Sequence, residues 1–161
     1  MGRHIPRTSR RPLPAGFTLL ELVIVLVILA TLGAIAAPRY ATALDRYHAD
    51  ATARRIVADL ELARATARNT SASVTVTFDP GLNSYVMTGV DSLDHPGTDA
   101  TLLLSRAPYR SQLVSTGLGG DDELVFDGFG VPDLGGTVLI QCGAESRTIA
   151  VDNATGIASV Q

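Results

Sequence analysis

One carboxylate lies inside a long apolar run near the start of the chain, where a charge is unexpected. Glu21 is the single charged residue of residues 17–37. A charge at the centre of a bilayer costs about 2.5–3.5 kcal/mol on insertion scales, and less near the end of a span. A cation close to Phe17, one helical turn earlier, could compensate it. The sequence encodes no cation there, but cleavage between Gly16 and Phe17 would create one, the free α-amino group of Phe17.

The run that contains Glu21 has the length of a membrane-spanning helix. Its roughly 21 residues would extend over about 31 Å, which matches the hydrocarbon core of a bilayer. Four arginines and no acid precede it, at positions 3, 7, 10 and 11. By the positive-inside rule the N-terminus is expected in the cytoplasm and the rest of the chain across the inner membrane.

Three kinds of segment share this outline: a cleaved secretory signal, a plain anchor and a prepilin leader. Ala34-Ile35-Ala36 fits the small-x-small cleavage pattern and would release a chain that begins at Ala37. Against a secretory signal, the apolar run exceeds the usual length of about 7–15 residues, and Glu21 interrupts it. A plain anchor explains the length but leaves the acid without a role.

The residues around the acid resemble the type IV prepilin motif. Residues 16–21 read Gly-Phe-Thr-Leu-Leu-Glu and follow a short basic leader, residues 1–16. The resemblance implies that a membrane-embedded prepilin peptidase cuts after Gly16 and methylates the new N-terminal Phe17. It also implies that Glu21 pairs with the N-terminus of a neighbouring subunit during filament assembly.

A long helix is expected to carry this motif and to continue beyond the membrane. Residues 17–37 form the membrane and filament-core part, and residues 38–69 form an amphipathic part. Gly33 and Pro38 are the expected kink positions, because proline removes a donor and clashes one turn back. The pairs Arg46–Asp50, Asp50–Arg54 and Arg55–Asp59 have the spacing of helical ion pairs.

Two apolar patterns divide the amphipathic part of the helix. One is a stripe at 3–4 spacing that is expected to pack on a head domain. The other is a patch nearer the membrane that is expected to meet filament neighbours. The stripe consists of Ala49, Ala53, Ile56, Leu60, Ala63 and Ala67, and the patch of Tyr40, Leu44, Tyr47 and Ala51.

Residues 70–161 are expected to form a β-rich periplasmic head. Short segments with alternating or β-branched residues, separated by Gly and Pro, predict antiparallel strands. The predicted strands are residues 73–78, 84–89, 101–105, 112–115, 123–126, 137–142, 148–151 and 157–160. The predicted fold class is therefore α+β, with a small antiparallel sheet packed on the long helix.

The sequence shows no pattern of an enzyme or of a cofactor site. His4, His48 and His95 are scattered, and there is no lysine. Cys142 is the single cysteine, so an inert, buried thiol is expected. The acids Asp121, Asp122, Glu123 and Asp127 could hold calcium, but they lack the 12-residue spacing of an EF-hand, and solvated loop acids are expected. We predict no catalytic residue, no metal and no cofactor.

The C-terminal region resembles the GspH/FimT group of pseudopilins. "LVFDGFGVPD" and "RTIAVDNATGIASV" match a Phe-x-x-x-Gly segment and a final hairpin, at residues 124–130 and 147–160. The resemblance implies a minor pseudopilin of a type II secretion system, with other pseudopilins, the prepilin peptidase and an inner-membrane assembly platform as partners. A minor type IV pilin for pilus priming or DNA uptake is the alternative.

Charge argues against the DNA-uptake role within that alternative. Some FimT-like pilins bind DNA through a Gly-Arg-x-Arg stretch, but here the position reads Gly156-Ile157-Ala158-Ser159. Residues 70–161 carry three Arg and eleven Asp or Glu, a net charge of −8. Such a surface repels a polyanion, so no nucleic-acid partner is expected.

Overall fold

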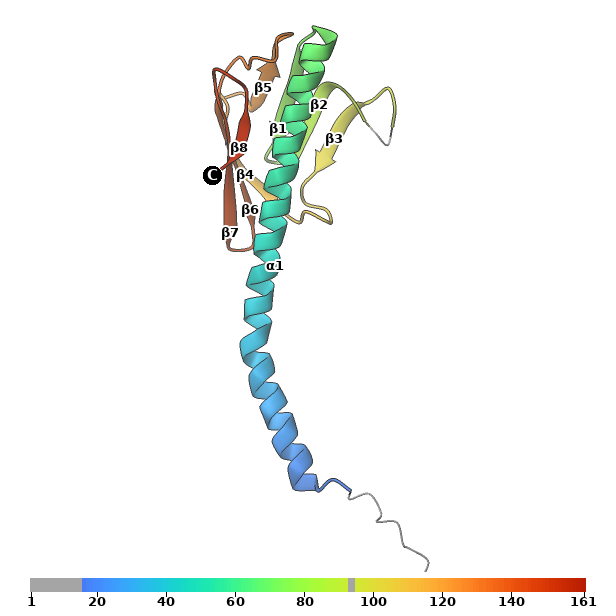
Figure 1. Ribbon diagram of the computed structural model, residues 1–161, viewed down its shortest axis with the longest axis vertical. Coiled ribbons are helices and arrows are strands. Elements are labelled where there is room, and N and C mark those ends of the chain that lie inside the picture. The colour runs from blue at the N-terminus through green and yellow to red at the C-terminus, as the bar shows by residue number, and fades with distance from the viewer. Residues whose placement is uncertain (1–15, 93–94) are drawn as a thin grey trace, which may run out of the picture. The chain divides into compact units, whose positions relative to one another are not determined.

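The structure is a computed structural model that describes residues 16–92 and 95–161 (Figure 1). The basic leader, apart from Gly16, lies outside the described residues. The chain divides into two compact units, Met1–Pro38 and Arg39–Gln161. The second unit contains every strand and the whole buried core.

One long helix runs from the first unit into the second. α1 spans Leu19–Thr70 and is assigned without interruption through Gly33 and Pro38. A bend at those two residues remains a prediction. The helix ends at Thr70, one residue beyond the predicted end at residue 69, and Ser71 then adopts a left-handed φ of 53°. The N–H of Ala72 donates to the carbonyl of Ala67 at 3.3 Å, which satisfies one of the free carbonyls of the last turn.

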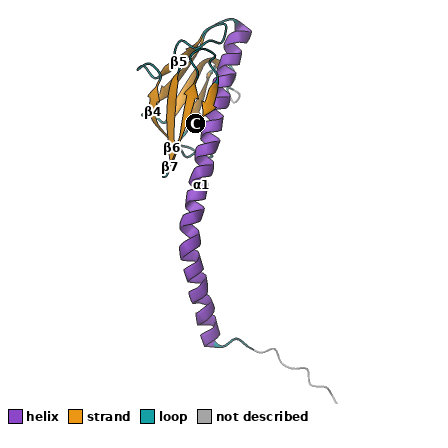
Figure 2. Cartoon of the chain, turned by 60° about the vertical axis from the view of Figure 1, so that its left-hand side comes forward, coloured by secondary structure: helices purple, strands orange, loops and turns teal. Residues whose placement is uncertain are grey.

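In the described part of the chain eight strands follow α1, and each corresponds to a predicted segment. The strands form two four-stranded antiparallel sheets, in the orders β3-β2-β1-β5 and β4-β6-β7-β8. Figure 2 shows the strands beside the C-terminal part of α1, so the predicted α+β class is confirmed. The strands are β1 (Val74–Asp79), β2 (Ser84–Asp91), β3 (Asp99–Leu103), β4 (Gln112–Gly117), β5 (Glu123–Phe126), β6 (Gly136–Cys142), β7 (Glu145–Val151) and β8 (Ala158–Val160).

Five of the six residues of the predicted stripe, all but Ala49, form the helical side of one continuous core. All six of its residues are buried, and four of the six are alanines, which allow the sheets to approach the helix closely. Both sheets contribute to the same core, for example through Val76 and Phe126 from the first and Ile140 and Ile149 from the second. Burial of this apolar stripe, with its 3.6-residue period, is what attaches the helix to the head.

The ion pairs made by residues 46–59 of α1 differ from those expected. Of the three predicted helical pairs, only Arg55–Asp59 is formed between the described side chains, at 2.9 Å. Arg46 Nε instead contacts Glu145 at 2.9 Å, and Asp50 accepts from Arg147 Nε at 2.6 Å. Helical spacing could not reveal that the β6–β7 hairpin brings opposite charges to these two positions.

Candidate functional site

The motif around Glu21 forms the capped first turn of α1. The N–H of Glu21 donates to the Thr18 hydroxyl at 3.2 Å, and the N–H of Leu22 donates to the Thr18 carbonyl, also at 3.2 Å. Thr18 is therefore the N-cap, and Glu21 occupies the third helical position. This is the Thr-x-x-Glu order of a capping box, a signal in the sequence that identifies Thr18 as a further residue of the site.

The capping geometry gives Glu21 a local role beside its expected assembly role. The first turn of a helix carries partial positive charge from free N–H groups, and an acid there is stabilised. Glu21 thus lies at the end of the helix where the helix dipole stabilises a negative charge. Thr31, deeper in the apolar segment, satisfies its hydroxyl by donating to the Ile28 carbonyl at 2.8 Å. In the described part of this segment, Glu21 is the one charged side chain.

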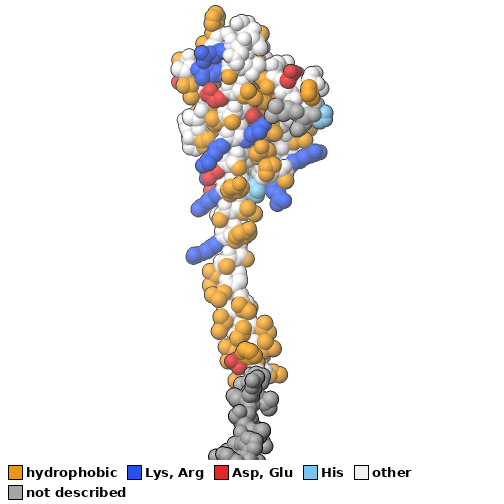
Figure 3. Space-filling model, turned by 45° about the vertical axis from the view of Figure 1, so that its right-hand side comes forward, with side chains coloured by type: hydrophobic (Ala, Val, Ile, Leu, Met, Phe, Trp, Pro, Cys, Tyr) orange, Lys and Arg blue, Asp and Glu red, His pale blue; other side chains and the backbone are white. Residues whose placement is uncertain are grey.

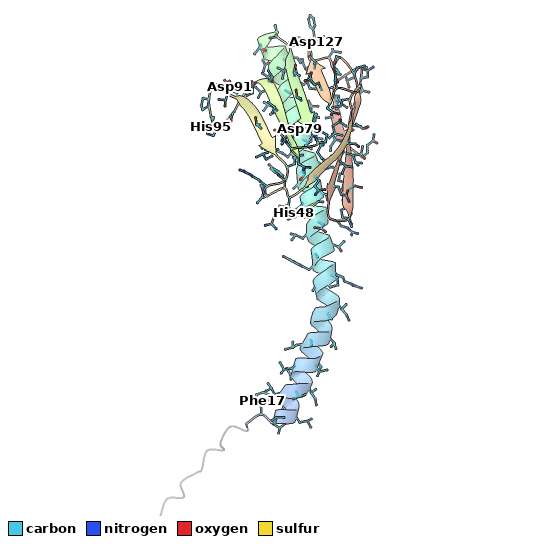
Figure 4. The ribbon with its side chains drawn as sticks, turned by 180° about the vertical axis from the view of Figure 1, so that it is seen from behind. Phe17, His48, Asp79, Asp91, His95 and Asp127 are labelled. Atoms are coloured by element: carbon cyan, nitrogen blue, oxygen red, sulfur yellow. The ribbon has the colours of Figure 1, made fainter. Side chains whose placement is uncertain are left out.

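The two residues of the predicted cleavage site are accessible and lie outside the helix. Gly16 and Phe17 precede the first helical residue, and Phe17 is 83% exposed (Figure 4). A Cβ at Gly16 would meet no atom within 4 Å. A peptide outside the helix and uncovered by other residues is open to binding by a protease.

The apolar segment after this site has no cover in its own unit. Every residue from 17 to 38 is exposed, and Figure 3 shows hydrophobic side chains along the visible face of this part of α1. Among the described residues, α1 alone is long and apolar enough to cross a membrane, by length and composition. The core helix of a soluble protein would be buried, and this segment is not.

The second unit continues this pattern on the helix face turned away from its sheets. At 100° per residue, one face of residues 40–65 lies opposite the buried stripe. That outward face is apolar except for Arg54. It consists of Tyr40, Leu44, Tyr47, Ala51, Ala58, Leu62 and Ala65, of which the two tyrosines are 72% and 67% exposed.

Several acids of the head accept hydrogen bonds from neighbouring residues. Within the described residues, no three His, Cys, Asp or Glu side chains come together as metal ligands. Asp122 pairs with Thr116, and Glu123 accepts from the Thr77 hydroxyl at 3.2 Å. Asp127 Oδ1 accepts two backbone N–H groups of the following turn.

The single thiol has the environment of a structural cysteine. Cys142 is buried, and its S–H donates to the Arg110 carbonyl at 3.3 Å. Burial raises the pKa of the thiol, and the nearby Asp45 carboxylate raises it further. The protonated form is therefore favoured, and it is neither a nucleophile nor a metal ligand.

Comparison with known proteins defines the class. The crystal structure of the type IV minor pilin FimU from Pseudomonas aeruginosa superposes with a TM-score of 0.51 at 14% identity, over 73% of this chain and 89% of that chain. Residues 13–37 match the prokaryotic N-terminal methylation motif. The fold and the N-terminal segment together are those of a pilin-like protein.

A family model that matches the C-terminal part of α1 and most of the head shows the family. Residues 52–155, more than half of the chain, match the family described as type II transport protein GspH, and the chain belongs to that family. No curated protein sequence matches this chain with significant similarity. The chain is thus a pseudopilin or a minor pilin, as the resemblance of its two ends to such proteins predicts.

Proposed function

We propose that the chain is a minor pseudopilin of a type II secretion system, a structural subunit of the periplasmic filament that helps to drive protein export. The observation that carries this proposal is the capped first turn, which presents Glu21 at the start of an uncovered apolar helix. Its head belongs to the GspH family, whose name refers to type II transport. The work of such a subunit is mechanical and interfacial, and it needs no catalytic residue of its own.

Before assembly, the bilayer covers the apolar segment. We infer a single span in the inner membrane, with the N-terminus in the cytoplasm and the head in the periplasm, because the arginines precede the span. The prepilin peptidase then cuts between Gly16 and Phe17 and methylates the Phe17 amine. Cleavage leaves the amine a few residues before Glu21, at the same end of the helix.

Assembly then replaces lipid with neighbouring helices. The new α-amino group of one subunit pairs with Glu21 of another, so that each charge in the apolar core finds its opposite between subunits. The apolar face from Tyr40 to Ala65 follows the membrane segment in the sequence and offers a second contact surface to neighbours. An inner-membrane assembly platform and the other pseudopilins are the expected partners.

Processing is the direct test. Intact-mass measurement of the chain purified from its host membranes should show loss of residues 1–16 and one methyl group on Phe17. A mature chain that begins at Ala37 would establish a secretory signal instead. An unprocessed N-terminus in a strain with active prepilin peptidase would contradict the filament role.

The fold similarity to FimU favours a second candidate, a minor type IV pilin. The same N-terminal chemistry serves both kinds of filament, so processing does not separate them. Deletion of the gene in its own host does: loss of protein export with intact pili supports the secretion role. Loss of pili with normal export supports the pilus role. The neighbouring genes provide a simple first indication.

A further inference from the structure

The arginines of the second unit gather around one end of it. At that end, α1 packs beside the turn of residues 104–111 and the β6–β7 hairpin. The hydroxyls of Thr52 and Ser111 are 2.8 Å apart, and the Cys142 thiol donates to the Arg110 carbonyl at 3.3 Å. Figure 3 shows basic side chains spread around this part of the head. We call it the basic end, and its arginines are Arg39, Arg46, Arg54, Arg55, Arg106, Arg110 and Arg147.

Ion pairing leaves the basic end with a net positive charge. Three of its arginines are held in ion pairs with neighbouring carboxylates, at 2.6–2.9 Å. The other four are exposed, and none forms an ion pair with a described side chain; they are Arg39, Arg54, Arg106 and Arg110. Two further acids lie at this end, Asp45 beside the buried thiol and Asp79 on the β1–β2 turn. That turn belongs to the basic end because the N–H of Leu104 donates to the Asn83 carbonyl within it. Four arginines against two acids leave a charge of 4 − 2 = +2.

The rest of the second unit is strongly acidic. Its described residues include Arg64 and Arg68 against nine carboxylates, a net charge of 2 − 9 = −7. These acids are Glu61, Asp91, Asp99, Asp121, Asp122, Glu123, Asp127, Asp133 and Asp152. Positive and negative charge are therefore separated within the unit, and the negative net charge of the whole unit conceals its positive end.

The basic end begins where the apolar run stops. Arg39 follows the apolar run and its proline directly, and α1 continues through both without interruption. At a rise of 1.5 Å per residue, Arg46 lies about 10 Å farther along the helix. Arg110 belongs to the same level, because its carbonyl and the Asp45 carboxylate contact the same thiol. The headgroup layer adds about 5–7 Å to each side of the hydrocarbon core, and long Arg side chains reach toward it. A chain anchored by the apolar run therefore brings these arginines to the phosphates of the leaflet.

We propose that the basic end binds the phosphate groups of anionic lipids in the periplasmic leaflet of the inner membrane. The guanidinium group suits this ligand, because it donates two parallel hydrogen bonds to one phosphate. The contact holds the head on the bilayer before assembly, and release of the lipid accompanies entry into a filament. It rests on the proposed membrane anchor and adds a lipid partner to the proposed function.

The anchor explains why the ligand is a lipid and not a soluble polyanion. A charge of +2 beside a strongly acidic surface attracts a free polyanion weakly, and salt screens it. An anchored head meets headgroups at a high effective concentration, so weak contacts are enough. Basic residues next to a membrane segment gain further from the negative surface potential of anionic lipids.

Hydrogen exchange of the full chain in lipid nanodiscs tests this contact. The chain is purified from its host membranes and placed in discs of phosphatidylcholine, with or without phosphatidylglycerol. Amides of residues 106–111 should exchange at least threefold more slowly in the anionic discs, because lipid contact holds the turn in place. High salt should remove this difference, because it shortens the screening length. Amides of residues 152–156, in the acidic part, should exchange equally in both.

Further arms identify the ligand. Glycerol phosphate added to the phosphatidylcholine discs should leave the exchange of residues 106–111 unchanged. Equal protection by glycerol phosphate would show a site for free phosphate and would overturn lipid docking. Equal exchange in the two kinds of disc would also overturn the proposal. Protection in host membranes but not in anionic discs would mean that a protein covers the basic end, against the proposal.

Charge removal identifies the arginines that make the contact. Arg106→Gln combined with Arg110→Gln should abolish the difference between the two kinds of disc, and Arg39→Gln alone should reduce it. Each variant is compared between the discs, so a change in the stability of the head affects both measurements alike. Arg68→Gln is the matched control, because Arg68 is exposed and lies in the acidic part. Loss of the difference in Arg68→Gln, or its retention in the double variant, would contradict the assignment.

Recovery of the chain in the discs separates this proposal from the proposed function. A chain that enters the discs but shows no lipid-dependent exchange refutes the lipid contact alone. A chain that does not enter the discs refutes the membrane anchor on which both the lipid contact and the filament role rest.

Discussion

The hydroxyl of Tyr85 donates a 2.5 Å hydrogen bond to Oδ2 of Asp59, and Arg55 Nε donates to the same oxygen at 2.9 Å. Asp59 is 5% exposed and lies on the part of α1 that packs against the first sheet. Burial, and then the Asp59 carboxylate, raise the pKa of Tyr85 far above its ordinary value. This cluster holds a buried charge at the contact between helix and sheet, where a charge needs full hydrogen bonding.

Removal of the Tyr85 hydroxyl should therefore destabilise the head. Tyr85→Phe leaves Asp59 with one donor fewer inside the protein, which costs about 1–3 kcal/mol of unfolding free energy. The measurement is urea unfolding of residues 39–161, which contain the whole core. Tyr47→Phe is the matched control, because Tyr47 is 67% exposed. Equal unfolding free energies for the two variants would show that the bond does not contribute.

The Arg46–Glu145 contact should make the stability of the head sensitive to acid. The hydrogen bond from Arg46 lowers the pKa of Glu145, and the charges of Arg46 and Arg147 act in the same direction. A carboxyl group whose pKa is lowered in the folded state stabilises the fold at pH values above its ordinary pKa of about 4.3. This stabilisation is lost as the pH falls through the lowered pKa of the folded state. The difference in thermal midpoint between the unsubstituted fragment and Glu145→Gln should thus shrink between pH 6 and pH 3. Arg46→Gln should behave likewise, and a constant difference would contradict the assignment.

Gly128 should tolerate no side chain, because its close neighbour is backbone. A Cβ there meets the Ser71 carbonyl carbon and oxygen at 2.9 Å, so Gly128→Ala should cost about 1–3 kcal/mol. At Gly81 the nearest atom is the flexible Asp79 Oδ1 at 3.2 Å. Gly81→Ala is thus the control and should change stability little. The two variants are compared by urea unfolding of residues 39–161. If Gly128→Ala loses no more unfolding free energy than Gly81→Ala, the turn can shift to accept the side chain.

Glu21→Ala should separate assembly from processing. The substitution keeps Gly16 and Phe17, so cleavage and membrane insertion should continue, while incorporation into filaments falls because the partner of the α-amino group is gone. Glu21→Gln keeps the shape and removes the charge, and it should behave as Glu21→Ala does. Incorporation is measured by recovery of the chain in sheared filament fractions. Recovery of either variant at the unsubstituted level would exclude the charge-pairing mechanism.

The head should not bind DNA. The second unit, residues 39–161, carries nine Arg and fifteen Asp or Glu, a net charge of −6. Between its described side chains, four of those arginines are held in ion pairs. The strand at Ala158–Val160 carries no arginine. Fluorescence anisotropy with labelled duplex DNA at near-physiological salt should show no complex. A salt-sensitive complex in the micromolar range would instead favour a role in DNA uptake.

Local patterns in the sequence determined most of the architecture. The eight strands, the helix stop and the buried alanine stripe could be predicted because periods of 2 and 3.6 residues report which face of an element is covered. The processing motif could be identified for a similar reason: residues 16–21 act together over one short stretch of chain. Thr18 belongs to the same stretch, and its capping role follows from a pattern of four residues.

Only the tertiary structure decided which distant residues meet. Division of the strands into two sheets depends on pairings such as β1 with β5, between residues about 50 positions apart, which no local period encodes. Arg46 and Asp50 had good partners at helical spacing, yet Glu145 and Arg147 are their partners because one core fixes the β6–β7 hairpin beside α1. The exposure of Phe129 likewise depends on the packing of Gly128 and Gly130, on either side of it, against the helix end. Contacts of this kind depend on how the whole core closes, and sequence spacing reports only the neighbours along one element.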